Sequence, residues 1–220
     1  MSNLVAQNLY YTYRNKAQQN EVLKGINICF KPGKMYAIVG KSGSGKTTLL
    51  SLLAGLDSPS SGSVFYDAQD VYKMNTDNYR LNHVSMIYQN FNLLPLLTAT
   101  ENVMLPLEMK GISKNDALIV ARERLFDVGL DQKTCGRYPS MLSGGEQQRI
   151  AIARALACES KIILADEPTG NLDTDNSCNI INLLKELVRD GNCCAIVVTH
   201  DNTVAEQAYE VLKLIDGRID

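Results

Sequence analysis

Eight residues from Gly40 to Thr47 combine glycines, hydroxyls and two lysines at a spacing typical of phosphate binding. They are Gly40, Lys41, Ser42, Gly43, Ser44, Gly45, Lys46 and Thr47, with Thr48 next. Glycines let backbone N–H groups wrap an anion without Cβ clashes, and a helix that follows adds a favourable dipole. Lys46 would reach the β- and γ-phosphates of a nucleotide, and the hydroxyl of Thr47 or Thr48 would ligate Mg²⁺. The alternative is a glycine-rich turn before a helix, and the complete match argues against it.

Two adjacent carboxylates end an apolar stretch later in the chain. Asp166 and Glu167 directly follow Ile162 to Ala165. Because ligands of parallel sheets bind at the carboxyl ends of strands, Asp166 can hold Mg²⁺ and Glu167 can deprotonate an attacking water as general base. His200 ends a second apolar stretch, where its imidazole can donate to the γ-phosphate or to the water. The alternative for the carboxylates is a solvated acidic strand end.

Alternating strand and helix patterns position these groups. Apolar runs predict buried strands at Met35–Val39, Val84–Tyr88, Ile162–Ala165 and Ala195–Thr199. Helices are predicted at Lys46–Ala54 and Thr174–Arg189. Such alternation indicates a mostly parallel sheet covered by helices, an α/β fold. Two further strands are expected at Leu4–Leu9 and Ile26–Phe30, with a polar loop over Arg14–Asn20 between them. Residues from about 90 to 158 read as a helical lobe inserted into this sheet.

A glycine pair stands at the start of one helix of that lobe. Ser143 and Glu146 are spaced as a capping box, which explains both side chains without any ligand. A capping box does not explain Gly144 and Gly145, which weaken a helix start. Paired glycines at this position leave backbone N–H groups open to an anion. The segment is therefore a second candidate for phosphate contact.

Leu142 to Gln147 resembles the signature motif of the ATP-binding subunits of ABC transporters, and the other motifs follow in that family's order. Gln89 matches the Q-loop, and Gly170 to Asp173 matches the D-loop. His200 matches the switch histidine. Tyr13 resembles the aromatic residue that stacks on adenine, with Tyr10 and Tyr11 as rivals. Phe91 to Pro95, Thr100 to Val103 and Asp166 to Asp173 resemble the macrolide-exporter and lipoprotein-releasing (MacB/LolD-like) subfamily.

The resemblance implies a P-loop ATPase fold with an N-terminal antiparallel β subdomain and an inserted α-helical subdomain, all in one domain of 220 residues. It also implies a homodimer with composite ATP sites. In such a dimer Ser143, Gly144, Gly145, Glu146 and Asp173 would contact the ATP of the opposite subunit. Glu167, His200 and Gln89 would be catalytic, and Thr47, Gln89 and Asp166 would hold Mg²⁺.

Composition and charge limit the classes of partner that the chain is expected to bind. The formal net charge is −2, from 22 basic and 24 acidic residues, which gives no basic footprint for nucleic acid. The sequence shows no signal peptide and no apolar run of spanning length, and its six cysteines follow no metal-binding pattern. We therefore expect a cytoplasmic protein that is peripheral on the inner face of the cell membrane through a partner. That partner would be an integral membrane permease docking near the apolar segment Phe91–Leu97.

Two interpretations share every catalytic residue. The first is an energy subunit that powers export or extraction of a peptide, lipoprotein or drug. The alternative is a regulatory cassette that controls a membrane signalling or cell-wall complex without moving a solute. Only the membrane partner distinguishes them, and the partner is not encoded in this chain.

Overall fold

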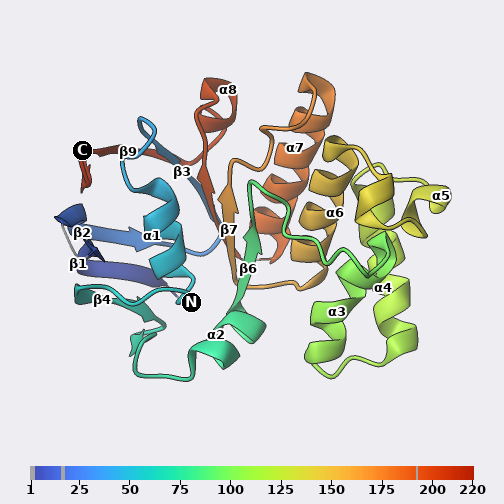
Figure 1. Ribbon diagram of the computed structural model, residues 1–220, viewed down its shortest axis with the longest axis horizontal. Helices are drawn as coiled ribbons and strands as arrows, with labels where there is room; N and C mark the ends of the chain where they lie inside the picture. The colour runs from blue at the N-terminus through green and yellow to red at the C-terminus, as the bar shows by residue number, and fades with distance from the viewer. Residues whose placement is uncertain (1–2, 16–17, 192) are drawn as a thin grey trace.

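A computed structural model describes residues 3–15, 18–191 and 193–220. Its strands form two sheets (Figure 1). The first has the order β2-β1-β4-β5 and is antiparallel, and the second has the order β10-β9-β3-β8-β7-β6. The strands are β1 (Leu4–Asn15), β2 (Gln18–Phe30), β3 (Lys34–Val39), β4 (Ser61–Tyr66), β5 (Gln69–Asp70), β6 (Val84–Ile87), β7 (Ile162–Asp166), β8 (Cys194–Val198), β9 (Glu210–Ile215) and β10 (Arg218–Ile219).

Helices lie between and beside these sheets. They are α1 (Lys46–Leu53), α2 (Thr76–His83), α3 (Ala99–Met109), α4 (Lys114–Asp127), α5 (Gln132–Cys135), the 3₁₀ turn Pro139–Met141, α6 (Gly144–Ala157), α7 (Thr174–Gly191) and α8 (Asn202–Ala205). Helix α1 lies on the side of the first sheet, whereas α3, α4, α6 and α7 lie on the opposite side of β7 (Figure 1). Within the described residues, no helix is long and apolar enough to cross a bilayer.

Successive side chains of the buried strands in the parallel sheet point to opposite faces, so each strand contributes to two hydrophobic cores. Along β7, Ile162 and Leu164 pack into the core shared with α1 and the first sheet. Ile163 and Ala165 point the other way, into the core shared with α3, α4, α6 and α7. Both faces of β7 are thus covered, which is why its sequence is uniformly apolar up to Asp166. The six cysteines are all free.

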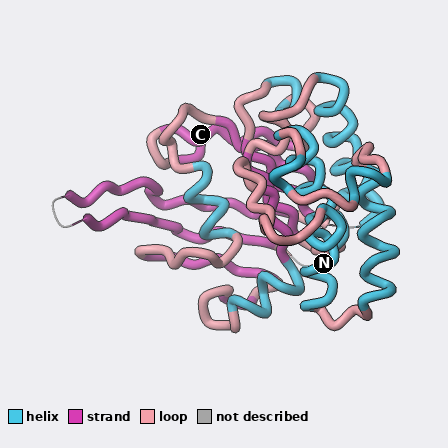
Figure 2. Tube along the Cα trace, turned by 45° about the vertical axis from the view of Figure 1, so that its right-hand side comes forward, coloured by secondary structure: helices cyan, strands magenta, loops and turns pink. Residues whose placement is uncertain are grey.

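The prediction of a polar loop over Arg14–Asn20 is wrong for most of that segment. Strand β1 continues to Asn15, and β2 already begins at Gln18, so the two strands pair almost to the end of the hairpin. Residues 16–17 lie outside the described part of the chain. The tyrosines of β1 favour extended backbone, and cross-strand pairing outweighs the polar composition of the segment. The long hairpin extends away from the rest of the molecule (Figure 2).

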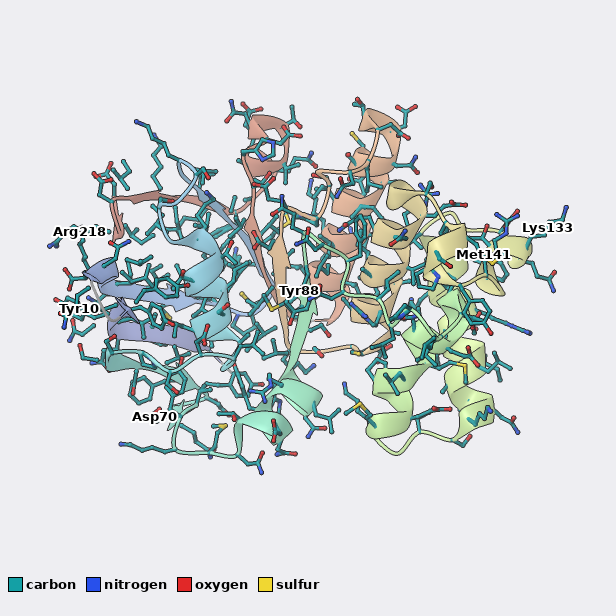
Figure 3. All side chains as sticks on the ribbon, in the orientation of Figure 1. Tyr10, Asp70, Tyr88, Lys133, Met141 and Arg218 are labelled. Atoms are coloured by element: carbon teal, nitrogen blue, oxygen red, sulfur yellow. The ribbon has the colours of Figure 1, made fainter. Side chains whose placement is uncertain are left out.

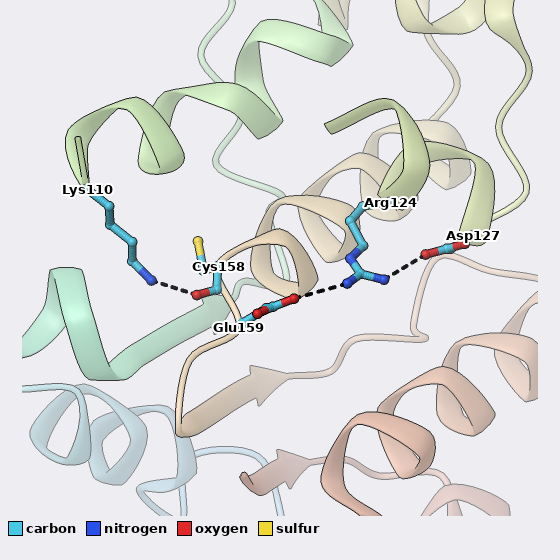
Figure 4. A network of polar contacts seen from close by, with 5 residues as sticks. All are labelled: Lys110, Arg124, Asp127, Cys158 and Glu159. Carbon is cyan, nitrogen blue, oxygen red and sulfur yellow. Dashed lines mark hydrogen bonds and ion pairs between the residues drawn. The ribbon is translucent and has the colours of Figure 1, made fainter. Parts of the chain in front are cut away.

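Polar contacts attach the outer helices to the end of α6 (Figure 4). Lys110, the C-cap of α3, donates to the carbonyl oxygen of Cys158 at 2.6 Å. Arg124 of α4 bridges Asp127 at 3.0 Å and Glu159 at 3.3 Å. Because Arg124 is largely shielded and binds two carboxylates, it fixes α4 against the chain that leads into β7. Helices α3 and α4 are therefore both bound to the short segment that leads from α6 into β7.

Candidate nucleotide site

One cavity of about 540 Å³ collects most of the predicted site residues. It lies at the carboxyl ends of β3, β7 and β8, where a parallel sheet presents its ligands. Its predicted lining residues are Tyr13, Gly40, Ser42, Gly43, Gly45, Lys46, Thr47, Thr48, Gln89, Asp166, Glu167 and His200. The volume falls within the range of small-molecule sites. Lys41 and Ser44 instead line a second hollow beside the loop, together with Lys213, and Gly40, Ser42 and Gly43 border both.

The loop between β3 and α1 requires glycine at two positions. Gly45 has a φ of 104°, in the left-handed region, and it is the N-cap of α1. At Gly40, a Cβ would lie 2.3 Å from the carbonyl oxygen of Leu214 on β9, so any side chain would push β9 away. The amino group of Lys46 donates to the carbonyl oxygens of Gly40 at 2.9 Å and Lys41 at 3.0 Å. This cation and the N-terminus of α1 make the loop electropositive.

Asp166 and Thr47 come together although 119 residues separate them in the chain. The hydroxyl of Thr47 donates to Oδ2 of Asp166 at 2.7 Å. Burial raises the pKa of Asp166, and this hydrogen bond partly offsets the rise. A cation beside the carboxylate would favour its charged form. The two hard oxygen donors, with the Gln89 side chain on the same cavity, suit Mg²⁺.

Glu167 and His200 form a close pair at the cavity wall. Oε2 of Glu167 lies 2.5 Å from Nδ1 of His200. Glu167 has a φ of 49°, a left-handed conformation that costs energy for a glutamate and turns its carboxylate away from the line of β7. Its backbone N–H donates to the Val198 carbonyl oxygen at 2.9 Å, which holds this turn against β8. In this conformation the carboxylate lies beside the histidine.

Of the three tyrosines weighed from the sequence, Tyr13 alone lines the cavity. Its ring is 48% exposed, and its hydroxyl lies 3.3 Å from Oγ1 of Thr48. Tyr11 packs against the core and meets Tyr13 edge-on, and Tyr10 approaches Gly25. Sequence reasoning missed two lining residues, Asn20 and Val22. Asn20 pairs with Tyr13 across the hairpin, so correct strand lengths would have revealed it.

The segment Ser143–Glu146 and Asp173 do not line this cavity. The capping box is present: the Ser143 backbone N–H donates to Oε2 of Glu146 at 2.8 Å, and the Glu146 N–H donates to the Ser143 hydroxyl at 3.3 Å. The Ser143 hydroxyl also donates to Oε2 of Glu146 at 2.7 Å, and the hydrogen bonds from Ser143 lower the pKa of Glu146. Asp173 accepts from the Asn176 backbone N–H at 2.9 Å. Figure 3 labels Met141, two residues before Ser143, toward the opposite end of the molecule from Tyr10. Ser143 and Gly144 are exposed, so this surface is open to a second molecule.

The segment after Gln89 is held by two side chains from the helices. Phe91 and Asn92 both adopt left-handed φ values, 59° and 48°. Arg154 of α6 donates to their carbonyl oxygens at 2.9 and 2.7 Å. Asn102, buried in α3, donates to the Leu94 carbonyl oxygen and accepts from the Leu94 N–H. The predicted apolar segment is therefore a fixed turn and not a regular element.

Together, the fold and the phosphate-binding geometry define a P-loop nucleoside triphosphatase. The sequence model of the family described as "ABC transporter" matches residues 23–170. The chain belongs to the ABC transporter family, and it is an ATP-binding, ATP-hydrolysing subunit of that family.

Individual relatives agree with this assignment. An uncharacterized ABC transporter ATP-binding protein, YclH of Bacillus subtilis, is 44% identical over 99% of this chain and 95% of its own length. The lipoprotein-releasing system ATP-binding protein LolD of Pseudoalteromonas translucida is 43% identical over 100% of this chain and 96% of its own. A dimeric structure of the ATP-binding cassette MJ0796, in a post-hydrolysis state with ADP and Pi, superposes with a TM-score of 0.95 at 38% identity; it covers 99% of this chain and 96% of that one. The MacB/LolD-like assignment and the α/β P-loop fold are confirmed.

Proposed function

We propose that two copies of this chain form a head-to-tail dimer with two composite ATP sites. The observation that carries this proposal is a division of the predicted site. Lys46, Asp166 and His200 share one cavity, whereas Ser143 and Gly144 are exposed away from it. A second copy, turned by a two-fold rotation, would bring the exposed glycine pair over the first copy's phosphates. The whole chain would act as one ATPase domain, with residues 90–158 as its helical sub-lobe.

Each cavity residue then has a role in binding. Lys46 neutralises the β- and γ-phosphates, and the backbone N–H groups from Gly40 to Thr47 surround them. The Tyr13 ring, half exposed at the cavity wall, stacks on adenine. Thr47, Asp166 and Gln89 hold Mg²⁺, which when bound stabilises the developing charge on the phosphate oxygens. MJ0796, whose structure contains ADP and Pi, supports a nucleotide at this place.

Hydrolysis in this proposal depends on the Glu167–His200 pair. Nδ1 of His200 binds Oε2 of Glu167, so Oε1 remains for the attacking water and takes its proton. The left-handed backbone at Glu167 fixes the carboxylate's direction before ATP arrives. Asp173, exposed just before α7, and Glu146, partly exposed in the first turn of α6, reach the opposite subunit's nucleotide once the two copies meet.

We further infer that the dimer powers a separate membrane permease. YclH and LolD are named as transporter and lipoprotein-releasing ATP-binding proteins, which supports export or extraction of a lipoprotein, peptide or drug. The chain would then work in the cytoplasm, on the inner face of the cell membrane.

The docking surface follows from exposed apolar residues. Leu94 is 43% exposed and Leu96 86%, beside the turn that follows Gln89. Next to this turn, a mainly apolar groove of about 600 Å³ runs between β6, α3 and α6, with Met86 and Met109 in its wall. Arg154 borders the groove and also holds the turn, so a helix docked there would be linked to Gln89. Exposed apolar surface of this kind marks interaction sites.

Leu94→Asp and Met109→Asp should each uncouple the cassette from its permease while leaving ATP affinity unchanged. A buried carboxylate in the docked interface would be desolvated without a partner, which weakens the complex. Co-purification with the permease and permease-stimulated ATPase rates measure the effect. Ile119→Asp is the matched control, because Ile119 is 58% exposed on α4 and outside the groove. Normal complex formation by both Leu94→Asp, in the turn, and Met109→Asp, in the groove, would refute the docking role.

Ser143→Arg should block hydrolysis while ATP still binds to the monomer. The added guanidinium fills the space where the opposite subunit's γ-phosphate would lie, so the composite site cannot close. Mixing Ser143→Arg with Lys46→Ala should recover part of the ATPase rate, because a mixed dimer contains one site with both features intact. Full activity of Ser143→Arg alone, or no recovery on mixing despite mixed dimers, would show that the site is not shared.

A further inference from the structure

Two consecutive glutamines of α6 differ in how their amides are satisfied. Nε2 of Gln147 donates to the carbonyl oxygens of Pro139 and Leu142, each at 3.1 Å. Gln148 is fully buried, and neither its Oε1 nor its Nε2 has a hydrogen-bond partner among the described residues. A buried amide without partners destabilises a protein, whereas an apolar side chain of the same shape does not. Gln148 therefore reduces stability in this conformation.

The amide lies on a functionally placed face of α6. Gln148 follows Gly145 by three residues and Gly144 by four, so helical geometry places the three positions on one side. A Cβ at Gly145 would be 3.5 Å from the carbonyl oxygen of Asn171, in the D-loop. A Cβ at Gly144 would be 3.7 Å from Cζ of Phe91, two residues after Gln89. This face of α6 thus lies between the D-loop and the Gln89 segment.

The D-loop in turn contacts the proposed general base. The Gly170 backbone N–H donates to the Glu167 carbonyl oxygen at 3.2 Å, and a Cβ at Gly170 would lie 3.7 Å from Oε2 of Glu167. A shift of α6 against the four-residue D-loop would therefore also move the carboxylate of Glu167.

We propose that Gln148 is a positioning residue whose amide makes its hydrogen bonds only in the ATP-bound, closed dimer, to the backbone of the D-loop, Gly170–Asp173. The unpartnered amide raises the free energy of the free subunit, and closure removes this penalty by supplying hydrogen-bond partners. The amide therefore favours the closed state. Gln148 would hold the D-loop, and through it Glu167, in register with the signature segment at the start of its own helix. This inference rests on the proposed composite site and adds a residue that touches no nucleotide.

The test compares Gln148→Met with Gln147→Met, because methionine nearly preserves the volume of glutamine. Without nucleotide, Gln148→Met should melt about 2–4 °C above the wild-type chain, since the unpartnered amide is gone. Gln147→Met should melt below it, because two carbonyl oxygens lose their donor. With Mg-ATP, Gln148→Met should lower kcat by about tenfold to a hundredfold through misplacement of Glu167, with the KM for ATP unchanged.

Two results would overturn the proposal. Gln148→Met that melts below wild type would mean that the amide is already satisfied in the free subunit, for example by a buried water. Gln148→Met with wild-type kcat would make the residue a packing residue only. Gln148→Leu, of similar volume and different branching, repeats the test if methionine packs poorly. ATP affinity is measured in the same preparations and tests the nucleotide site separately. If the wild-type chain does not bind ATP, the proposed function fails, whatever Gln148→Met does.

Discussion

Lys46→Ala should raise the Kd for ATP by about 10²–10³-fold, which corresponds to removing one partner from a buried, hydrogen-bonded charge pair. Lys46 lies on the cavity wall, and its amino group already points at the loop, where it binds the carbonyl oxygens of Gly40 and Lys41. Of the loop's two lysines, Lys46 is the one that lines the cavity, so the substitution leaves the triphosphate facing backbone N–H groups there. Isothermal titration of the purified chain with ATP measures the change.

The control for this experiment is Lys213→Ala. Lys213 is exposed on β9 and lines the second hollow beside the loop, outside the nucleotide cavity. Its removal changes the net charge by the same amount without touching the proposed phosphate position, so affinity should remain at the wild-type value. Equal affinities for all three proteins would remove Lys46 from the site.

Glu167→Gln should keep ATP binding and slow hydrolysis by about 10²–10⁴-fold, the usual contribution of a general base. The amide retains the size of the carboxylate and can still contact His200, but it cannot take a proton from water. Single-turnover hydrolysis under saturating Mg-ATP measures the chemical step apart from product release. Glu206→Gln is the matched control, because Glu206 is an exposed carboxylate just after α8 and outside the cavity. A wild-type rate for Glu167→Gln would assign the proton transfer to another group.

The sequence predicted which side chains meet in one cavity, because the ends of buried strands are easy to recognise. Asp166 and His200 each stand at the end of an apolar run that predicts a buried strand. A parallel sheet brings the carboxyl ends of its strands to one edge. The phosphate loop is continuous in sequence, so its residues needed no tertiary information. Even so, the structure separates Lys41 and Ser44 from the cavity wall, a distinction that depends on which way each residue of the loop turns.

Other features depended on contacts that no local pattern contains. The hairpin between β1 and β2 reads as polar loop in its outer half, and only pairing across the strands makes it regular and places Asn20 beside Tyr13. Gln148 reads as an ordinary polar position of a helix, whereas packing on all sides of α6 buries it completely. The shared nature of the ATP site came from resemblance, and the geometry supports it only through the exposure of Ser143 and Gly144.

The composite dimer is tested most directly by the mass of Glu167→Gln in solution with and without Mg-ATP, measured by size-exclusion chromatography with light scattering. If ATP joins two cassettes and hydrolysis separates them, the variant should be monomeric without nucleotide and dimeric with Mg-ATP. Adding Ser143→Arg to the same chain should abolish that dimer while ATP still binds. A variant that binds Mg-ATP tightly and remains monomeric would contradict the shared site and the account built on it.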